Sequence, residues 1–147
     1  MQEDRRDFIK KTCILCAGIA GGLGFSSLLT SCVSFPRVKA SVKQHTVEIP
    51  LSSFAEGNMI IITPKEYYYD ILVVKKSDTE YNAVLMKCSH QDNMLIATKS
   101  GLNCTLHGSN FDLNGKPLSG PAINPLTRFP TEISGSSLIV KNVPTDY

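Results

Sequence analysis

The sequence predicts an all-β domain, either a sandwich or a barrel, and two observations indicate this class. Short apolar runs rich in β-branched and aromatic residues recur along the chain, with turn-forming residues between them. No segment after residue 40 keeps the 3.6-residue period of an amphipathic helix. Many short strands within a segment of about 110 residues are typical of a β-sandwich or barrel.

Six strands are expected in this domain. They follow the apolar runs at 46–51, 59–63, 67–75, 81–87, 94–98 and 137–140. Turns are expected between runs, where glycine, asparagine, aspartate and serine gather, at 56–58, 77–78, 100–101, 114–115 and 134–136. The segment 119–125 (SGPAINP) is expected to be a stiff loop, because its two prolines give a strand ladder no N–H.

Size and charge limit what the chain can do. With 147 residues, 42% of them hydrophobic, it has room for one small domain and an appendage. The 15 Lys and Arg against 13 Asp and Glu give a net charge of +2, which provides no electrostatic footprint for a nucleic acid. We therefore expect no nucleic-acid partner.

The first 32 residues have the layout of an export signal. Arg5 and Arg6 stand in DRRDFIK, which resembles the twin-arginine motif of the bacterial pathway that exports folded proteins. An uncharged stretch follows at 13–31 and ends in Leu-Thr-Ser before Cys32, which resembles the lipobox of bacterial lipoproteins. A lipid anchor on Cys32 is the favoured outcome, with an uncleaved membrane-spanning helix or simple cleavage as the alternatives.

Three parts are expected along the chain: the export signal with its lipobox cysteine at 1–32, a short tether at 33–44 and the folded domain at 45–147. Of the five cysteines, Cys88 and Cys104 alone fall in the folded part, so a disulfide framework is not expected. Cys13 and Cys16 lie inside the signal and are assigned no role.

Both cysteines of the folded part stand in motifs that also contain histidine. Cys88 and His90 form C-x-H, and Cys104 and His107 form C-x-x-H, with residues 91–103 between the motifs. Two thiolates and two imidazoles suit a tetrahedral zinc ion, or a [2Fe-2S] cluster in which two histidines replace two cysteines on one iron. The spacing alone leaves both open.

The residues that follow the second motif resemble the Rieske protein family. In that family, C-x-H and C-x-x-H lie on two loops at one end of an antiparallel β fold, followed by Gly-Ser, an aromatic-Asp pair, a hairpin turn and a Gly-Pro-Ala loop. The matching residues here are Gly108, Ser109, Phe111, Asp112, Asn114-Gly115 and Gly120-Pro121-Ala122. The resemblance covers roughly residues 45–143. It implies a Rieske-type antiparallel β-sandwich or barrel with one [2Fe-2S] cluster per chain.

The resemblance also implies how the cluster is held. Cys88 and Cys104 would bind the buried iron, and His90 and His107 would bind the iron near solvent. Neutral imidazoles in place of two thiolates make the cluster less negative, which raises its reduction potential to roughly −150 to +300 mV.

Five residues beside the ligands are expected to tune the site. Gly108 would let the backbone approach the cluster, and Ser109 would donate its hydroxyl to a cluster sulfur. Phe111 stands where high-potential members carry a tyrosine whose hydroxyl bonds a ligand sulfur. Asn93 and Leu106 occupy the positions of a bracing disulfide in members from quinol-oxidising complexes. We therefore expect an intermediate potential.

These features predict a membrane-tethered carrier of single electrons that faces the periplasm from the bacterial cell envelope. Its partners are expected to be redox proteins, in a quinol-oxidising complex or a periplasmic oxidoreductase. A stand-alone Rieske oxygenase is excluded, because its mononuclear iron needs two further histidines and only His45 is left. The alternatives are a Rieske-type ferredoxin for an oxygenase and a zinc-binding structural protein of the envelope.

Overall fold

A computed structural model describes residues 34–145. The predicted twin-arginine pair, Arg5 and Arg6, and the predicted lipobox Cys32 lie outside the described residues. Within residues 34–145, no helix is long and apolar enough to cross a membrane.

The described residues are almost entirely β-structure. The elements in chain order are β1 (Arg37–Ala40), β2 (Thr46–Pro50), the 3₁₀ helix η1 (Leu51–Phe54), β3 (Met59–Pro64), β4 (Ile71–Lys75), β5 (Tyr81–Leu85), β6 (Ile96–Ala97), β7 (Gly101–Asn103), β8 (Asn110–Asp112), β9 (Pro117–Ser119), β10 (Arg128–Phe129), β11 (Thr131–Ser134) and β12 (Ser137–Lys141). The prediction of an all-β domain is confirmed.

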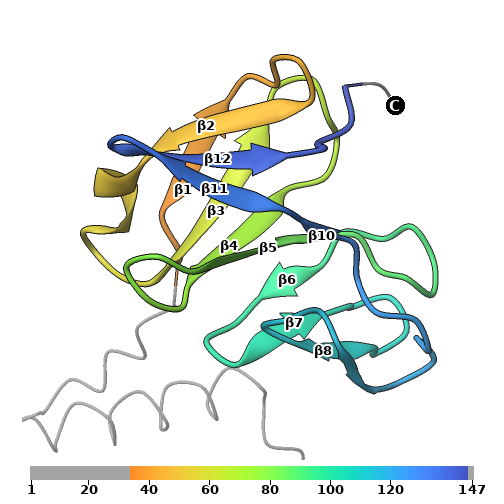
Figure 1. Ribbon diagram of the computed structural model, residues 1–147. Helices are drawn as coiled ribbons and strands as arrows, with labels where there is room; N and C mark the ends of the chain where they lie inside the picture. The colour runs from red at the N-terminus through yellow and green to blue at the C-terminus, as the bar shows by residue number, and fades with distance from the viewer. Residues whose placement is uncertain (1–33, 146–147) are drawn as a thin grey trace, which may run out of the picture. The chain divides into compact units, whose positions relative to one another are not determined.

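Three sheets build the domain (Figure 1). The large sheet has the order β1-β3-β4-β5-β10, in which β1 is parallel to β3 and the other pairs are antiparallel. A second antiparallel sheet, β11-β12-β2, faces it, and a small antiparallel sheet, β6-β7-β8-β9, lies apart from these two.

The central strands β3, β4 and β5 are buried on both faces. This explains why their sequences read as unbroken apolar runs, since a strand with one solvent face would alternate with polar residues. One face packs against β2 and β12 in a first core that includes Val47, Ile49, Ile60, Ile62, Ile71, Val73, Leu85, Leu138 and Val140. The other face contributes to a second core of Met59, Ile61, Leu72, Val74, Val84, Met86, Cys88, Leu95, Leu102, Cys104, Phe111, Ala122 and Leu126.

All six expected strands have counterparts in the structure, which are β2, β3, β4, β5, β6 and β12, with shifts at their ends. The expected strand at 67–75 begins only at Ile71, because the tyrosines before it lie in an irregular segment. Strands β1, β7, β8, β9, β10 and β11 were not predicted.

The predicted tether at 33–44 is wrong for most of its length. The backbone oxygen of Pro36 accepts a 2.9 Å hydrogen bond from the Ile61 N–H, and Arg37–Ala40 then form β1. A two-residue turn at Gln44 and His45, both with positive φ, joins this segment to β2. The folded domain therefore begins near Pro36 and not at residue 45.

The predicted turn at 114–115 is a hairpin turn that the sequence specifies well. In the β8–β9 turn, Asp112 Oδ1 accepts hydrogen bonds of 2.8 Å from the N–H groups of Asn114 and Lys116. Gly115 has φ +82° there, and a Cβ on it would lie 2.8 Å from a Val84 methyl group. Both the backbone conformation and the second core therefore require glycine at this position.

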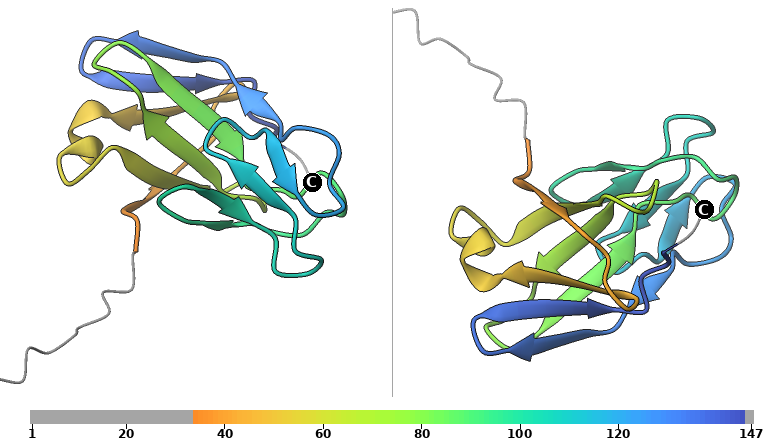
Figure 2. Two further views of the ribbon diagram at one scale, coloured as in Figure 1. Left: turned by 90° about the horizontal axis from the view of Figure 1, so that it is seen from below. Right: turned by 90° about the horizontal axis from the view of Figure 1, so that it is seen from above.

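The small sheet and its loops extend from one end of the domain. Figure 2 shows this end from below and from above, with η1 at the opposite end in both views. Pro144, in the segment after β12, lines a hollow together with Cys88 and Ser89 of the segment that follows β5.

Candidate metal centre

Two loops at this end carry the four predicted ligands, and a third loop lies against them. The first loop follows β5 and holds Cys88 and His90, and the second joins β7 to β8 and holds Cys104 and His107. The third loop joins β9 to β10 and contains the Gly-Pro-Ala segment. Because β7 and β8 are antiparallel neighbours, the second loop is a tight connection, closed by the hydrogen bond of 2.8 Å from the Cys104 N–H to the Ser109 oxygen.

The two cysteines are buried, with exposed fractions of 1% for Cys88 and 3% for Cys104. Neither thiol forms a disulfide, and both belong to the second core. The apolar side chains of the central sheet therefore form the floor on which the cysteines lie.

The two histidines are exposed and lie side by side. The ring centroids of His90 and His107 are 5.1 Å apart, and the ring planes are nearly perpendicular. Each ring comes from a different loop, so the loops bring together one buried thiol pair and one exposed imidazole pair.

This pairing fits a two-iron cluster. Among the described residues, no three Cys, His, Asp or Glu side chains gather around one metal position. The predicted ligands instead form two pairs, and a Rieske-type cluster needs two protein ligands on each iron. The chemistry of the donors agrees, since thiolates suit the buried iron and neutral imidazoles the iron near solvent.

The environment of Cys104 favours its thiolate. Burial alone raises the pKa of this thiol. Hydrogen bonds from the backbone of Leu106 and His107 and from the side chains of Cys88 and Asn93 outweigh burial and hold the pKa below its ordinary value. A thiolate is the form that binds metal, so the loop is arranged for a ligand before any metal arrives.

The first loop is held by several hydrogen bonds. The Cys88 N–H donates to the Asn93 oxygen at 2.8 Å, and the Asn93 side-chain amide lies 3.7 Å from Cys104 Sγ. The hydroxyl of the buried Tyr69 donates to the Asp92 oxygen at 2.6 Å. Lys87 Nζ lies 3.0 Å from Asp92 Oδ2 and 5.3 Å from the centre of the Tyr69 ring.

The third loop is tied to both ligand loops. The Ser89 hydroxyl donates to the Asn124 oxygen at 2.6 Å, and the Ala122 N–H donates to Ser109 Oγ at 3.1 Å. Gly120 has φ +89°, and a Cβ on it would lie 2.6 Å from Ser109 Cα. The Gly-Pro-Ala loop therefore packs directly on the backbone of the second ligand loop, at a distance that excludes a side chain.

The structure gives the positions of the residues predicted to tune the site. Ser109 is completely buried, and its oxygen accepts the Ala122 N–H, which leaves the hydroxyl proton for a donation of its own. Gly108 has φ +75°, so its backbone conformation accounts for glycine there. Phe111 is buried in the second core. His45 lies in the β1–β2 turn, with Nδ1 3.3 Å from the Val143 oxygen, and has no place in the site.

Three residues of the site were missed or undervalued. Asn93 was expected to matter only because it stands in place of a disulfide cysteine, and its amide near Cys104 was not anticipated. Tyr69 lies 19 positions before Cys88, and the sequence carries no signal for its bond to the first loop. Gly120 belongs to the Gly-Pro-Ala motif, which was a signal that could have placed it against Ser109.

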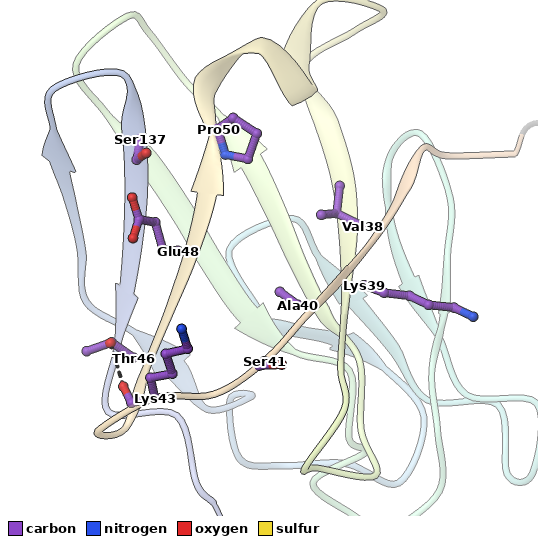
Figure 3. A pocket seen from close by; sticks show the side chains of 9 residues that line it. All are labelled: Val38, Lys39, Ala40, Ser41, Lys43, Thr46, Glu48, Pro50 and Ser137. Carbon is purple, nitrogen blue, oxygen red and sulfur yellow. Dashed lines mark hydrogen bonds between the residues drawn. The ribbon is translucent and has the colours of Figure 1, made fainter.

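Two hollows in the surface of the described residues differ in whether they touch this site. One, of about 510 Å³, lies between β1 and β2 (Figure 3). Its lining includes Lys39, Lys43, Glu48 and Ser137, with no cysteine or histidine, so it offers no comparable set of metal ligands. A hollow of about 330 Å³ lies beside the first ligand loop, between Cys88, Ser89 and the C-terminal Pro144.

Comparison with known proteins identifies the family. The family model described as Rieske [2Fe-2S] domain matches residues 45–130. The 3-phenylpropionate/cinnamic acid dioxygenase ferredoxin subunit of Shigella boydii serotype 4 (strain Sb227) is 32% identical over 96 residues, which are 62% of this chain and 87% of that protein.

Solved structures agree with the family model. The plasma membrane Rieske protein PetC3 from Synechocystis PCC 6803 matches with a TM-score of 0.52 and 28% identity, over 63% of this chain and 94% of that one. A structure of reduced oxygenase with oxidised ferredoxin in carbazole 1,9a-dioxygenase shares the fold, with a TM-score of 0.52 and 20% identity over 69% of this chain and 96% of that one. The chain belongs to the Rieske [2Fe-2S] domain family, and is an electron-transfer protein with a [2Fe-2S] cluster.

Proposed function

We propose that this chain carries single electrons between redox proteins of the bacterial cell envelope, tethered to the membrane and facing the periplasm. The observation that carries the proposal is the exposed pair His90 and His107 above the buried pair Cys88 and Cys104. We assign these four residues as the cluster ligands. When bound, the cluster takes up and releases one electron at a time.

The two ligand pairs have different roles. Cys88 and Cys104 hold the inner iron within the second core, where apolar side chains exclude water. His90 and His107 hold the outer iron and present imidazole edges to a partner.

The residues around the ligands support an intermediate reduction potential. Ser109 is placed to stabilise added negative charge by donating its hydroxyl to a sulfur. Phe111 has no hydroxyl with which to add a second donor, and Leu106 and Asn93 form no bracing disulfide. Phe111→Tyr would therefore raise the potential, and Ser109→Ala would lower it.

The N-terminal residues support the cellular location. Arg5 and Arg6 would direct the folded, cluster-loaded chain to the twin-arginine pathway, and Cys32 would carry a lipid that holds the domain at the membrane. The 28% identity to a plasma membrane Rieske protein is consistent with this location. The partners would then be a quinol-oxidising complex or a periplasmic oxidoreductase, together with an electron acceptor.

The loops that a partner would meet are nearly free of charge. Residues 88–93, 104–109 and 120–127 contain one carboxylate, Asp92, which is paired with Lys87. Leu106 and Ile123 are 54% and 86% exposed on these loops. Association with the partner should therefore depend weakly on salt, because few exposed charges are available for screening.

The test is expression of the full chain in a bacterium that assembles iron-sulfur clusters, followed by fractionation. We expect a brown protein with two irons per chain in the membrane fraction. Arg5→Lys with Arg6→Lys should keep it in the cytoplasm, and Cys32→Ala should remove the lipid mass from the mature chain. Wild-type protein that stays in the cytoplasm would refute the location, and a colourless protein with one metal per chain would refute the cluster.

A second function is favoured by one observation. The 32% identity to a dioxygenase ferredoxin subunit supports a ferredoxin that delivers electrons to an oxygenase. The same fractionation separates the two functions. A ferredoxin of that kind would be recovered with the soluble proteins both in the wild type and when export is blocked.

A further inference from the structure

We infer that Asn93 is a positioning residue of the cluster: its side-chain amide links the two ligand loops and raises the reduction potential by donating a hydrogen bond to Cys104 Sγ. The inference rests on the proposed function for the assignment of Cys104 as a ligand.

The geometry places Asn93 between the two cysteines. Its backbone oxygen accepts the Cys88 N–H at 2.8 Å, and its side-chain Nδ2 lies 3.7 Å from Cys104 Sγ, within the longer reach of a hydrogen bond to sulfur. The same Nδ2 donates to the Met94 oxygen at 3.1 Å. One residue of the first loop is therefore bonded to the thiol-bearing residues of both loops.

The surroundings fix the direction in which this amide points. An antiparallel bridge between Lys87 and Met94 closes the first loop at its base, so Asn93 has a defined place at the end of the loop. Its side chain is half-buried. With one N–H directed at Met94 and the other at Cys104, the amide nitrogen has both of its donors in use.

The chemical effect follows from the charge on sulfur. Reduction adds an electron to the cluster and increases the negative charge on its sulfur ligands, and an N–H donor stabilises that charge more in the reduced state than in the oxidised state. The half-buried position strengthens the effect, because water screens it incompletely. The amide should therefore raise the potential and hold Cys104 in place at the same time.

A purely structural role would have another signature. The Asn93 N–H also bonds the Gln91 oxygen at 2.5 Å, so this residue closes a tight turn through its backbone. If the turn were its whole role, any residue compatible with the turn would leave the potential unchanged. The side-chain donor must therefore be removed without altering the backbone.

The test uses the full chain with its cluster, extracted in detergent, and three variants. Asn93→Leu removes the donor without adding charge, and Asn93→Asp removes the donor at nearly constant shape and adds a carboxylate. Asn103→Leu is the matched control, because Asn103 is an exposed asparagine directly before Cys104. The measurements are iron content, reduction potential by EPR titration, and iron–sulfur stretching frequencies by resonance Raman spectroscopy.

We expect the ratio of reduced to oxidised protein at a fixed ambient potential to fall about tenfold in Asn93→Leu, which corresponds to 59 mV for a one-electron couple. The ratio should fall further in Asn93→Asp, and an iron–sulfur stretching band should shift in both variants. Asn103→Leu should change the ratio less than twofold. If both Asn93 variants match the control in potential and stretching bands, the inference is wrong.

The remaining outcomes are also decisive. If the Asn93 variants lose iron while their metal-free forms unfold like metal-free wild type, the amide holds the ligand loops, as inferred. If the metal-free variants do not fold, Asn93 is a general structural residue and the inference fails. Failure of the proposed ligand assignment is distinguished by the wild-type protein alone, which would then lack two irons per chain.

Discussion

The two cores on either side of the central sheet differ in what completes them. The first core consists of aliphatic and aromatic side chains between β3–β5 and the β11-β12-β2 sheet. The second core contains the thiols of Cys88 and Cys104, and loops joined by single hydrogen bonds close it. The first core is therefore complete in the chain itself, whereas the second would be completed by the cluster under the proposed ligand assignment.

The difference teaches how stability and function are separated in this domain. Full burial of a large aliphatic side chain stabilises the fold by about 1.5–3 kcal/mol, and the first core contains many such side chains. These contributions need no cluster. Under the proposed ligand assignment, residues of the second core should instead decide whether the loops hold a cluster and at what potential.

Removal of a proposed ligand should have the largest effect on the difference between the two cores. Cys104→Ala should abolish the cluster, because one iron loses a thiolate and no other cysteine among the described residues can replace it. Iron content should fall from two per chain to none. The first core should survive, so we expect cooperative unfolding by circular dichroism. A variant without a folded transition would mean that the two cores do not form independently.

Ile60→Ala should give the largest loss of stability without a change in redox properties. Ile60 is fully buried in the first core, and truncation to alanine should lower the free energy of unfolding by about 2–5 kcal/mol. Denaturant titration measures this loss, and the potential should stay as in wild type. Leu102→Ala, equally buried in the second core, is the counterpart and should also speed iron loss to a chelator. Equal rates of iron loss in both variants would contradict the separation.

Gly120→Ala tests the contact between the third loop and the second ligand loop. Its Cβ would lie 2.7 Å from the Gly108 oxygen in a backbone with φ +89°, so we expect a loss of about 1–3 kcal/mol in unfolding free energy. Gly57→Ala is the control, since a Cβ there meets nothing within 4 Å. Thermal unfolding of both holo variants measures the difference. Equal melting temperatures would show that the third loop can move away at little cost.

Tyr69→Phe should have the smallest effect. Removing the hydroxyl deletes the 2.6 Å hydrogen bond to the Asp92 oxygen and should lower the free energy of unfolding by about 1 kcal/mol. Tyr68→Phe, at a side chain that is 64% exposed, should change it by less than about 0.5 kcal/mol. Hydrogen exchange of the first-loop amides should be faster in Tyr69→Phe. Unchanged exchange would remove Tyr69 from the residues that hold the loop.

The sequence was a good guide wherever a strand is buried. The runs that became β3, β4 and β5 are apolar throughout because both of their faces are covered, and such runs are recognisable without a partner. Strand β1 (RVKA) and the three-residue strands β7, β8 and β9 of the small sheet are short and partly polar. Their pairing depends on the strands beside them, which local sequence does not contain.

The same distinction applies to the site. The four proposed ligands stand in two short motifs, and the Gly-Ser and Gly-Pro-Ala segments indicated the loops that the structure places beside them. The bonds of Asn93 to Cys104 and of Tyr69 to Asp92 were not predictable, because they join segments that meet only in the folded domain. Contacts between loops depend on the whole fold and not on spacing along the chain.

The early start of the fold limits how far the domain can travel from a membrane. If Cys32 is the lipidated residue, as proposed, the packing of Phe35 on the second core and the hydrogen bond from the Ile61 N–H to Pro36 leave residues 33–34 between the anchor and the fold. Three residue steps extend to at most about 11 Å. An electron carrier held this close to its lipid anchor cannot diffuse between distant complexes. It must instead rotate about its anchor, and it would exchange electrons with partners whose redox centres open close to the lipid headgroups.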